Sequence, residues 1–307
     1  MSVVSGVTVT IPATTANLGP GFDCIGAALT LYNEFKFTRL EAGGLTINVT
    51  GVEAERVKTD ESNLVYEAFL KFYRHLEQTP PSVKIEIQLG VPLARGLGSS
   101  ATAIVAGLVA ANQLAGAPLS QLQVMELAIA MEGHPDNVVP ALLGGCRLAA
   151  TSDAGWEICD VPWHKDVVPI VGIPDFELST KEARRVLPTE VSRADAIFNT
   201  AHLGLLLRGL ETGKGEWLRA ALQDRLHQPY RKALIPGYDA VNAAAVAAGA
   251  YGMVISGAGP TLLALADVGH SQAVEAAIAN AWHEAGITAV VRSLSVDTQG
   301  ARTFHEG

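Results

Sequence analysis

The sequence has few cysteines and no run of basic residues, and each of these deficits excludes a class of protein. Cys24, Cys146 and Cys159 are odd in number and lack C-x-x-C spacing, so they indicate neither a disulfide framework nor a zinc site. We expect them to be buried free thiols. A net charge of −9 without any cluster of Lys or Arg argues against a nucleic-acid-binding surface.

Long apolar stretches are also absent. No apolar run reaches the length of a membrane span, and the N-terminus lacks a basic segment followed by an apolar core. These two absences predict a cytoplasmic protein without membrane contacts. The 307 residues are 49% hydrophobic and 17% charged, which is typical of a folded globular chain with one large or two medium domains.

A glycine-rich turn between an expected strand and an expected helix is the most informative stretch that the sequence does contain. Residues 83–89 alternate apolar and polar side chains as a strand does, and the small-residue run over 99–115 predicts a helix. Gly96 and Gly98 lie between them. Glycines let backbone N–H groups come close to a ligand, and the first turn of a helix carries free amides. The stretch therefore predicts an anion-binding site.

Two known phosphate-binding patterns do not explain this turn. The Walker A motif requires a Gly-Lys-Ser/Thr ending, and the turn contains no lysine. Residues 96–101 match the looser G-x-G-x-x-A dinucleotide pattern, but residues 87–125 include no acidic residue that could bind a ribose. A plain connection between a strand and a core helix remains as the alternative. Ser99 and Ser100 weigh against it, because hydroxyls at a helix start can hold a phosphate or a metal ion.

Three stretches together resemble the GHMP small-molecule kinases. Residues 92–101, Pro-Leu-Ala-Arg-Gly-Leu-Gly-Ser-Ser-Ala, are similar to the phosphate loop of that family, and residues 12–23 and 255–261 match two further motifs in the right order. Residues 12–23 and 132–140 are most similar to the homoserine kinases within the family. The resemblance covers nearly the whole chain. It implies an α+β, two-domain GHMP-kinase-like fold with the active site in the interdomain cleft.

A change of character near residues 162–169 predicts the boundary between the two domains, because Trp163, His164 and Pro169 interrupt the short apolar runs there. We expect an N-terminal ATP-binding domain at 1–163 and a C-terminal GHMP kinase domain at 164–307. The resemblance, and nothing in the residues themselves, also suggests a homodimer.

The resemblance implies ATP and Mg²⁺ as cosubstrate and cofactor. The β- and γ-phosphates are expected at the backbone amides of residues 95–100, and Mg²⁺ between Ser100 and Glu126, whose oxygens suit a hard cation. Glu126 falls on the apolar face of a helix expected over 120–132, where a buried carboxylate requires a cation, either a metal ion or an arginine. The residues expected at the nucleotide are Asn63, Pro92, Leu93, Ala94, Arg95, Gly96, Leu97, Gly98, Ser99, Ser100, Ala101 and Thr180.

Several of these assignments have structural alternatives. Asn63 begins a helix expected over 63–75, so it is also a candidate N-cap. Residues 3–11 alternate as a strand does and lead into 12–23, which is expected to form a polar loop. Residues 134–137 are expected to form a polar turn that ends the preceding helix.

L-Homoserine is the acceptor that the resemblance implies, phosphorylated on its hydroxyl in threonine biosynthesis. This molecule carries an ammonium, a carboxylate and a hydroxyl, so its site needs an anion, a cation and a neutral polar group. The residues expected to bind it are the anions Asp23 and Asp136, the cations Arg184 and Arg231, the neutral Asn17 and His134, and the backbone of Gly257 and Gly259.

The group that accepts the hydroxyl proton stays open at this point. Several family members carry an aspartate near the attacking hydroxyl, whereas this chain has Asn137 next to Asp136, and an amide cannot accept a proton from an alcohol. We favour transfer of the proton to the γ-phosphate, with Asp136 as a base being the alternative. The expected catalytic residues are Asn137, Asp136, Ser100 and Glu126.

Two other functions stay open beside this one. The first is a GHMP kinase that acts on a sugar, on mevalonate or on an isoprenoid precursor. The second is a nucleotide-binding regulator with the same fold and no turnover, against which the presence of Ser100 and Glu126 argues.

Overall fold

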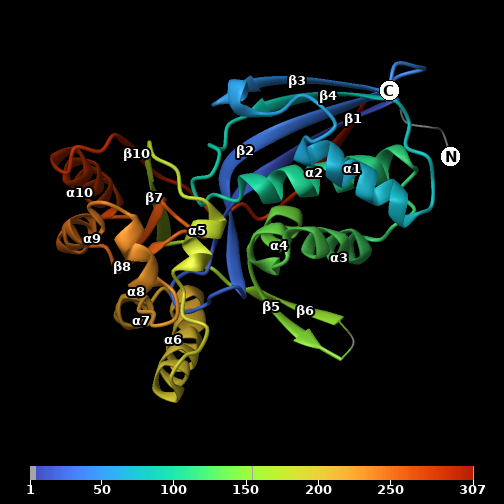
Figure 1. Cartoon of the computed structure of the whole chain (residues 1–307). Coiled ribbons are helices and arrows are strands. Elements are labelled where there is room, and N and C mark those ends of the chain that lie inside the picture. Colours follow the sequence, from blue (N-terminus) through green and yellow to red (C-terminus); the bar gives the residue numbers. More distant parts are fainter. Residues whose placement is uncertain (1–4, 154, 307) are drawn as a thin grey trace.

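The strands form two separate sheets that lie side by side (Figure 1). The computed structural model describes residues 5–153 and 155–306. The first sheet contains β1 (Gly6–Ala16), β2 (Ile25–Arg39), β3 (Leu45–Gly51), β4 (Val83–Leu89), β5 (Cys146–Ser152), β6 (Gly155–Val161) and β11 (Arg302–Glu306). Its order is β11-β1-β2-β4-β3, and β5 joins β2 to β6. The second sheet contains β7 (Val167–Pro174), β8 (Gly252–Ile255), β9 (Leu262–Asp267) and β10 (Ala289–Ser293), in the order β10-β7-β9-β8.

Helices cover each sheet. The first half carries η1 (Ala54–Arg56), α1 (Leu64–His75), α2 (Ser99–Leu114), α3 (Gln121–Glu132) and α4 (Pro135–Leu143). The second carries α5 (Thr180–Arg185), α6 (Arg193–Thr212), α7 (Gly215–Ala221), α8 (Gln228–Arg231), η2 (Lys232–Leu234), α9 (Tyr238–Ala247) and α10 (Ser271–Glu284). In the first half α2 and α4 contact the sheet, and in the second α9 and α10 do. The fold is therefore the α+β, two-domain arrangement that the sequence predicts.

The central helix of the first half is α2, which is buried along almost its whole length. It lies between the sheet and α1, whose buried face carries Phe69 and Phe72. The small residues of α2 make this close approach feasible. A Cβ on Gly107 would lie 2.3 Å from the carbonyl oxygen of Val65 in α1, so only glycine fits there. This packing fixes the N-terminus of α2, where the glycine-rich turn ends.

A shared apolar core joins the two halves. It contains Ile25 and Leu29 from β2 together with Leu206 from α6 and Leu222 and Leu263 from the second half. Each half also has a core of its own. Because buried apolar contacts run continuously from one half to the other, the two sheets are held in a fixed mutual position.

The structure confirms several expected elements and corrects others. The strand over 83–89 is β4, and the expected helices over 63–75, 99–115 and 120–132 are α1, α2 and α3. The strand expected over 3–11 is β1, although its first two residues lie outside the described part of the chain. The polar loop expected from residue 12 was wrong in its first part, because β1 continues to Ala16 after a register shift between Pro12 and Ala13.

Two further expectations were wrong. Residues 134–137 do not form a simple turn, since Pro135 starts α4 and His134 is its N-cap. Pro at the first position of a helix forfeits no hydrogen bond, so the same residue that ends one helix can start the next. The three thiols are free, but only Cys146 is buried; Cys24 is half-buried and Cys159 is exposed.

The predicted boundary at residue 163 falls between β6 of the first sheet and β7 of the second. The C-terminal end of the chain returns to the first sheet, where β11 pairs with β1. Residues 302–306 therefore belong to the sheet of the first half.

Candidate active site

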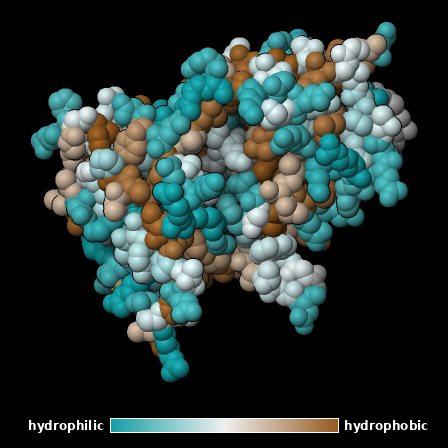
Figure 2. Space-filling view, viewed as in Figure 1, coloured by the Kyte–Doolittle hydropathy of each residue, from teal (hydrophilic) through white to brown (hydrophobic). Residues whose placement is uncertain are grey.

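A cavity of about 560 Å³ lies where the two halves meet, and the molecular surface is visibly hollowed there (Figure 2). Two ends can be distinguished. The glycine end is the stretch from Gly96 to Ser100 at the start of α2. The charged end consists of Asp23, His134, Asp136, Arg184 and Arg231. The predicted residues that line the cavity are Asn17, Asp23, Asn63, Leu93, Ala94, Arg95, Gly96, Gly98, Ser99, Ser100, His134, Asp136, Asn137, Thr180, Arg184, Arg231, Gly257 and Gly259.

The glycine end offers backbone amides to the cavity. Gly98 is the N-cap of α2 in a left-handed conformation and makes no side-chain cap, so the first-turn amides stay available for a ligand. A Cβ on Gly96 would lie 2.3 Å from the carbonyl oxygen of Ser256 and 2.9 Å from that of Gly259. The hydroxyl of Ser256 also donates to the Gly96 carbonyl, at 2.6 Å. The turn is thus locked against the segment that connects β8 to β9.

The side chain of Arg95 does not supply a cation to the glycine end. Its guanidinium is buried and donates to the carbonyl oxygens of Leu93, Pro174 and Asp175 and to the carboxylate of Glu53. The predicted nucleotide contact of Arg95 is therefore limited to its backbone. The side chain instead ties the glycine turn to β7 of the second half.

Three other residues predicted at the nucleotide do not line the cavity. The side chain of Leu97 lies in the shared core, and that of Ala101 lies in the core of the first half. Pro92 also lies outside the cavity lining. Their place in the motif reflects packing of the turn and helix rather than a side-chain contact with a ligand.

Asn63 is the N-cap of α1 and lines the cavity at the same time. Its side-chain oxygen accepts a hydrogen bond from the Val65 amide, and its side-chain nitrogen donates to the carbonyl of Lys58. The cavity beside it is lined by apolar side chains of Phe35, Val57, Leu64, Ile87, Leu89 and Leu93. The amide of Asn63 therefore shapes the edge of an apolar compartment.

The carboxylate beside Ser100 is Glu132, and the prediction of Glu126 was wrong. The Ser100 hydroxyl lies 3.1 Å from Oε2 of Glu132, and both residues line the cavity. Glu126 is exposed and is not part of that lining. Residues 126 and 132 differ by six positions, or about 240° around a helix, so they cannot share a face. The signal for Glu132 was present, because it is the first residue of the motif at 132–140.

Glu132 is a carboxylate in an unusual environment. Burial raises its pKa and outweighs the charge of His134 and the hydrogen bond from Ser100, which act in the opposite direction. The described residues contain no group of three or more His, Cys, Asp or Glu side chains that could hold a metal ion. A cation held here by the protein would therefore have Ser100 and Glu132 as its side-chain ligands.

Both acidic side chains at the charged end, Asp23 and Asp136, already have hydrogen-bonded basic partners. Arg184 donates two hydrogen bonds to Asp23, at 2.8 and 2.9 Å, which raises the pKa of the guanidinium. His134 Nδ1 lies 2.5 Å from Oδ1 of Asp136. Burial alone would lower the pKa of His134, but the hydrogen bond and charge of Asp136 outweigh burial and raise it. Asp23 and Asp136 therefore each have a basic side chain within hydrogen-bonding distance.

Arg231 differs from these groups because no described carboxylate pairs with it. The residue is only 2% exposed, and its Nε and Nη1 atoms donate to the carbonyls of Ala183 and Gly257. Burial and repulsion from Arg184 lower the pKa of its guanidinium to about 10, so the group remains cationic at neutral pH. The cavity therefore contains a buried positive charge that has no anionic partner within residues 5–153 and 155–306.

Two further asparagines predicted for the site, Asn17 and Asn137, have their amides engaged by the protein. Asn17 donates to the carbonyl of Gly257 and accepts from the Asp23 amide, so it fixes the loop that carries Asp23. The Asn137 side-chain oxygen accepts from the Thr14 hydroxyl, and its nitrogen donates to Asp136 at 3.3 Å. Both residues order the charged end.

Sequence reasoning missed several residues that line the cavity. Lys58 and Ser62 lie near Asn63, and Asn33 connects Thr102 of α2 with the amides of Gly90 and Val91. No motif marks Asn33, because its partners come from segments far away in the sequence.

Among the described residues, no helix is both long and apolar enough to cross a membrane.

Comparison with known proteins shows the family of this chain. The models of the GHMP kinase N-terminal domain and of the GHMP kinase C-terminal domain match residues 63–145 and 206–287. The chain is 84% identical to a homoserine kinase from Nostoc punctiforme over 304 residues, covering 99% of this chain and all of that protein. It is 83% identical to a homoserine kinase from Microchaete diplosiphon over the whole of both chains.

Solved structures of kinases are also similar to this chain. The crystal structure of homoserine kinase from Cytophaga hutchinsonii superposes with a TM-score of 0.90 at 31% identity, covering 99% of each chain. A mevalonate kinase from L. major in complex with R-mevalonate has a TM-score of 0.70 at 16% identity, over 94% of this chain and 95% of that one, which shows a common fold alone. This chain therefore belongs to the GHMP kinase family and, within it, to the homoserine kinases.

Proposed function

We propose that this chain transfers the γ-phosphoryl group of ATP to the hydroxyl of L-homoserine, giving O-phospho-L-homoserine for threonine biosynthesis. The observation that carries the choice of acceptor is the buried cation Arg231, which lines the cavity without a carboxylate partner among the residues that the structure describes. An uncompensated buried charge costs free energy. An acceptor with its own carboxylate removes that cost, whereas a sugar does not.

ATP binding is supported by the two compartments of the cavity. The apolar compartment beside Asn63 suits an adenine ring, and the amides at the start of α2 suit the β- and γ-phosphates. Phosphoryl transfer depends mainly on positioning and charge stabilisation, so a rigid backbone cradle is an appropriate device.

Ser100 and Glu132 fit a Mg²⁺ ion. A hydroxyl and a carboxylate that lie close together and face the cavity are oxygen ligands of the kind that this hard cation prefers, and its other ligands can be waters and nucleotide phosphates. When bound, the ion supplies positive charge that stabilises the transferring phosphoryl group.

The charged end orients L-homoserine. Arg231 and Arg184 bind its carboxylate, with Arg231 contributing the guanidinium that has no other anion. Asp23 and Asp136 bind its ammonium in place of their present partners, Arg184 and His134. Because L-homoserine brings one positive and one negative charge, the total charge of the cavity does not change. Asn17, His134 and the loop from Gly257 to Gly259 hold these groups in place.

We assign the hydroxyl proton to the γ-phosphate. Asn137 cannot accept it, because an amide is not a base and its oxygen already accepts a hydrogen bond from Thr14. Asp136 is hydrogen-bonded to His134 and Asn137, which suits an orienting role. A homodimer and a cytoplasmic location stay predictions.

A panel of acceptors tests the function. ADP release should be measured with L-homoserine, 4-hydroxybutanoate, 3-aminopropan-1-ol, mevalonate and galactose. We expect L-homoserine to give the highest kcat/KM, because only this acceptor presents both an ammonium and a carboxylate. A higher kcat/KM with mevalonate or galactose, or no ATP-dependent turnover of any acceptor, would contradict the proposal.

A further inference from the structure

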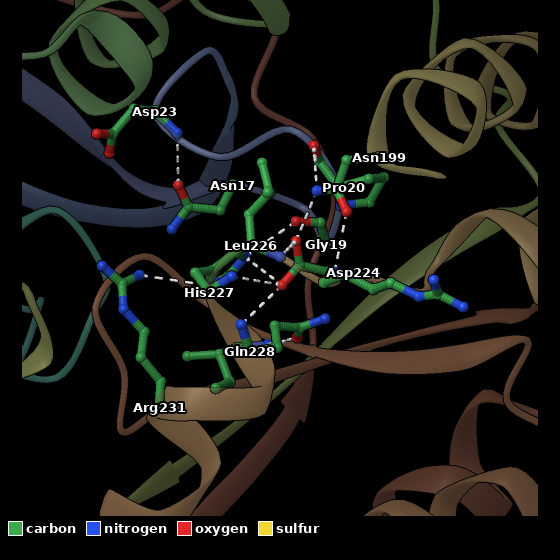
Figure 3. A network of polar contacts seen from close by, with 12 residues as sticks. Asn17, Gly19, Pro20, Asp23, Asn199, Asp224, Leu226, His227, Gln228 and Arg231 are labelled. Carbon is green, nitrogen blue, oxygen red and sulfur yellow. Dashed lines mark hydrogen bonds and ion pairs between the residues drawn. The ribbon is translucent and has the colours of Figure 1, made fainter. Parts of the chain in front are cut away.

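A buried histidine, His227, lies beside the guanidinium of Arg231 (Figure 3). It is not among the residues that line the cavity. His227 is 0% exposed. Its Nε2 atom lies 2.9 Å from the carbonyl oxygen of Gly19, and its Nδ1 atom lies 3.4 Å from Nη1 of Arg231. The two ring nitrogens therefore connect the loop after β1 with the unpaired cation of the cavity.

These two partners fix the protonation state of the ring. A carbonyl oxygen can only accept, so Nε2 of His227 must carry a hydrogen. A guanidinium can only donate, so Nδ1 must present its lone pair to Arg231. A proton on Nδ1 would point at an N–H group of Arg231. The geometry thus requires a neutral His227 in the Nε2–H form, and burial acts in the same direction by lowering its pKa.

The backbone around His227 is anchored as firmly as its ring. The carboxylate of Asp224 accepts hydrogen bonds from the amides of Leu226, His227 and Gln228. It also accepts from the side chain of Asn199, which in turn donates to the carbonyl of Pro20 (Figure 3). His227 is consequently held at a defined position relative to the loop that carries Asp23.

His227 completes the set of contacts that orient the Arg231 guanidinium. The carbonyls of Ala183 and Gly257 accept from Nε and Nη1, and His227 accepts from Nη1 on another side. The ring of Phe22 stacks on His227 and lies 5.1 Å from the guanidinium carbon. No described residue binds Nη2 of Arg231, so this nitrogen remains for a ligand.

We propose that His227 is a positioning residue, which holds Arg231 so that Nη2 meets the carboxylate of the acceptor. The inference rests on the proposed function. His227 does not touch the acceptor, and it acts on acceptor affinity through the direction of one guanidinium.

Two substitutions separate positioning from a general structural role. In His227→Asn the side-chain oxygen takes the place of Nδ1 and keeps the contact with Arg231. In His227→Gln the amide takes the place of Nε2 and keeps only the contact with Gly19. We expect His227→Gln to raise KM for L-homoserine by about 5- to 30-fold and His227→Asn by less than about threefold. If His227 only filled space, the order would be reversed, because asparagine leaves the larger void.

The acceptor lacking a carboxylate provides the second arm. His227→Gln should leave kcat/KM for 3-aminopropan-1-ol and KM for ATP within about twofold of the parent. It should also add nothing to the KM defect of Arg231→Ala, because two residues that act through one contact are not additive. The matched control is His202→Gln on α6, whose ring contacts the Phe198 carbonyl outside the cavity lining. Equal losses with both acceptors would overturn the inference.

A readout in the free protein separates this inference from the proposed function. Nitrogen chemical shifts of ¹⁵N-labelled histidine at pH 7 report the tautomer of His227 without any acceptor, with His227→Gln used to assign the signal. We expect the neutral Nε2–H form. An imidazolium or an Nδ1–H form would overturn the positioning role, even if the parent phosphorylates L-homoserine. Conversely, if His227 has the Nε2–H form but the protein does not phosphorylate L-homoserine, the contact that orients Arg231 is supported and the proposed function is contradicted.

Discussion

The glycine end and the charged end of the cavity use different parts of the polypeptide. At the glycine end a contiguous stretch presents backbone amides, and the arginine that precedes it, Arg95, points its side chain into the junction between the halves. At the charged end five ionisable side chains from distant segments converge. From this difference we expect nucleotide binding to depend on the backbone conformation and acceptor choice to depend on individual side chains. Substitutions of side chains should therefore have small effects at the first end, provided that Gly96 and Gly98 are retained, and large effects at the second.

The largest effect is expected where the two ends meet, at Glu132. Glu132→Gln should lower kcat by about a hundredfold or more and raise the Mg²⁺ concentration needed for half-maximal rate, because it removes the carboxylate that we propose as a metal ligand. The matched control is Glu126→Gln on the exposed face of the same helix, which should retain parental kinetics. Kinetics over a magnesium titration, normalised to folded protein, check both. A defect in Glu126→Gln equal to that in Glu132→Gln would contradict the assignment.

The second effect is expected at the arginines of the charged end. Arg231→Ala should raise KM for L-homoserine by roughly 10- to 150-fold, which corresponds to one charged hydrogen bond of about 1.5–3 kcal/mol. Arg184→Ala should raise it less, because Arg184 shares its guanidinium with Asp23. KM for ATP should barely change in either variant. Equal increases in the KM values for ATP and L-homoserine would show that the two ends are not separate.

A smaller effect is expected at Asp136. Asp136→Asn should raise KM for L-homoserine by about tenfold and leave the pH profile of kcat unchanged in form, since Asp136 orients the acceptor. Initial rates across a pH series provide the measurement. If kcat instead fell by several orders of magnitude at constant KM, and the acidic limb of the profile disappeared, Asp136 would be the base.

A still smaller effect is expected at the glycine end. Ser99→Ala removes a hydroxyl that lines the cavity but leaves the backbone amides in place, so KM for ATP should change by less than about threefold. The comparison between the ends would fail if Ser99→Ala weakened ATP binding as strongly as Arg231→Ala weakens acceptor binding. Isothermal titration with a non-hydrolysable ATP analogue would measure this directly.

The smallest effect concerns the thiol of Cys24 beside the charged end. Burial raises its pKa to about 11, and the charges of Asp136 and Asp23 add to this shift. At pH 8 only about one molecule in a thousand carries the thiolate, so iodoacetamide should modify exposed Cys159 and leave Cys24 intact. Raising the pH towards 11 should increase the rate at Cys24. Peptide mass spectrometry checks the order, and faster labelling of Cys24 at pH 8 would contradict it.

The same contrast explains how far the sequence alone could predict the site. The glycine turn was predictable because strand, turn and helix are continuous in the chain, and each has a local signature. Glu126 was chosen wrongly because apolar neighbours at helical spacing do not show which face of a helix reaches a cavity: Glu126 is exposed, whereas Glu132 lines the cavity. Arg231 and Asp23 were found by resemblance, but their unequal partners were not, because each partner comes from another segment: Asp23 pairs with Arg184, 161 positions away, and Arg231 donates to Ala183, 48 positions away. His227 carried no local signal at all.

The shared apolar core has a consequence for unfolding. Because side chains of β2 and of α6 occupy one continuous core, neither half can melt without exposing apolar surface of the other. A calorimetric scan should therefore contain a single transition for the whole chain. A fragment ending at residue 163 would leave Ile25 and Leu29 facing water, and it should aggregate rather than fold. The cavity therefore lies within a single unit that folds and unfolds cooperatively.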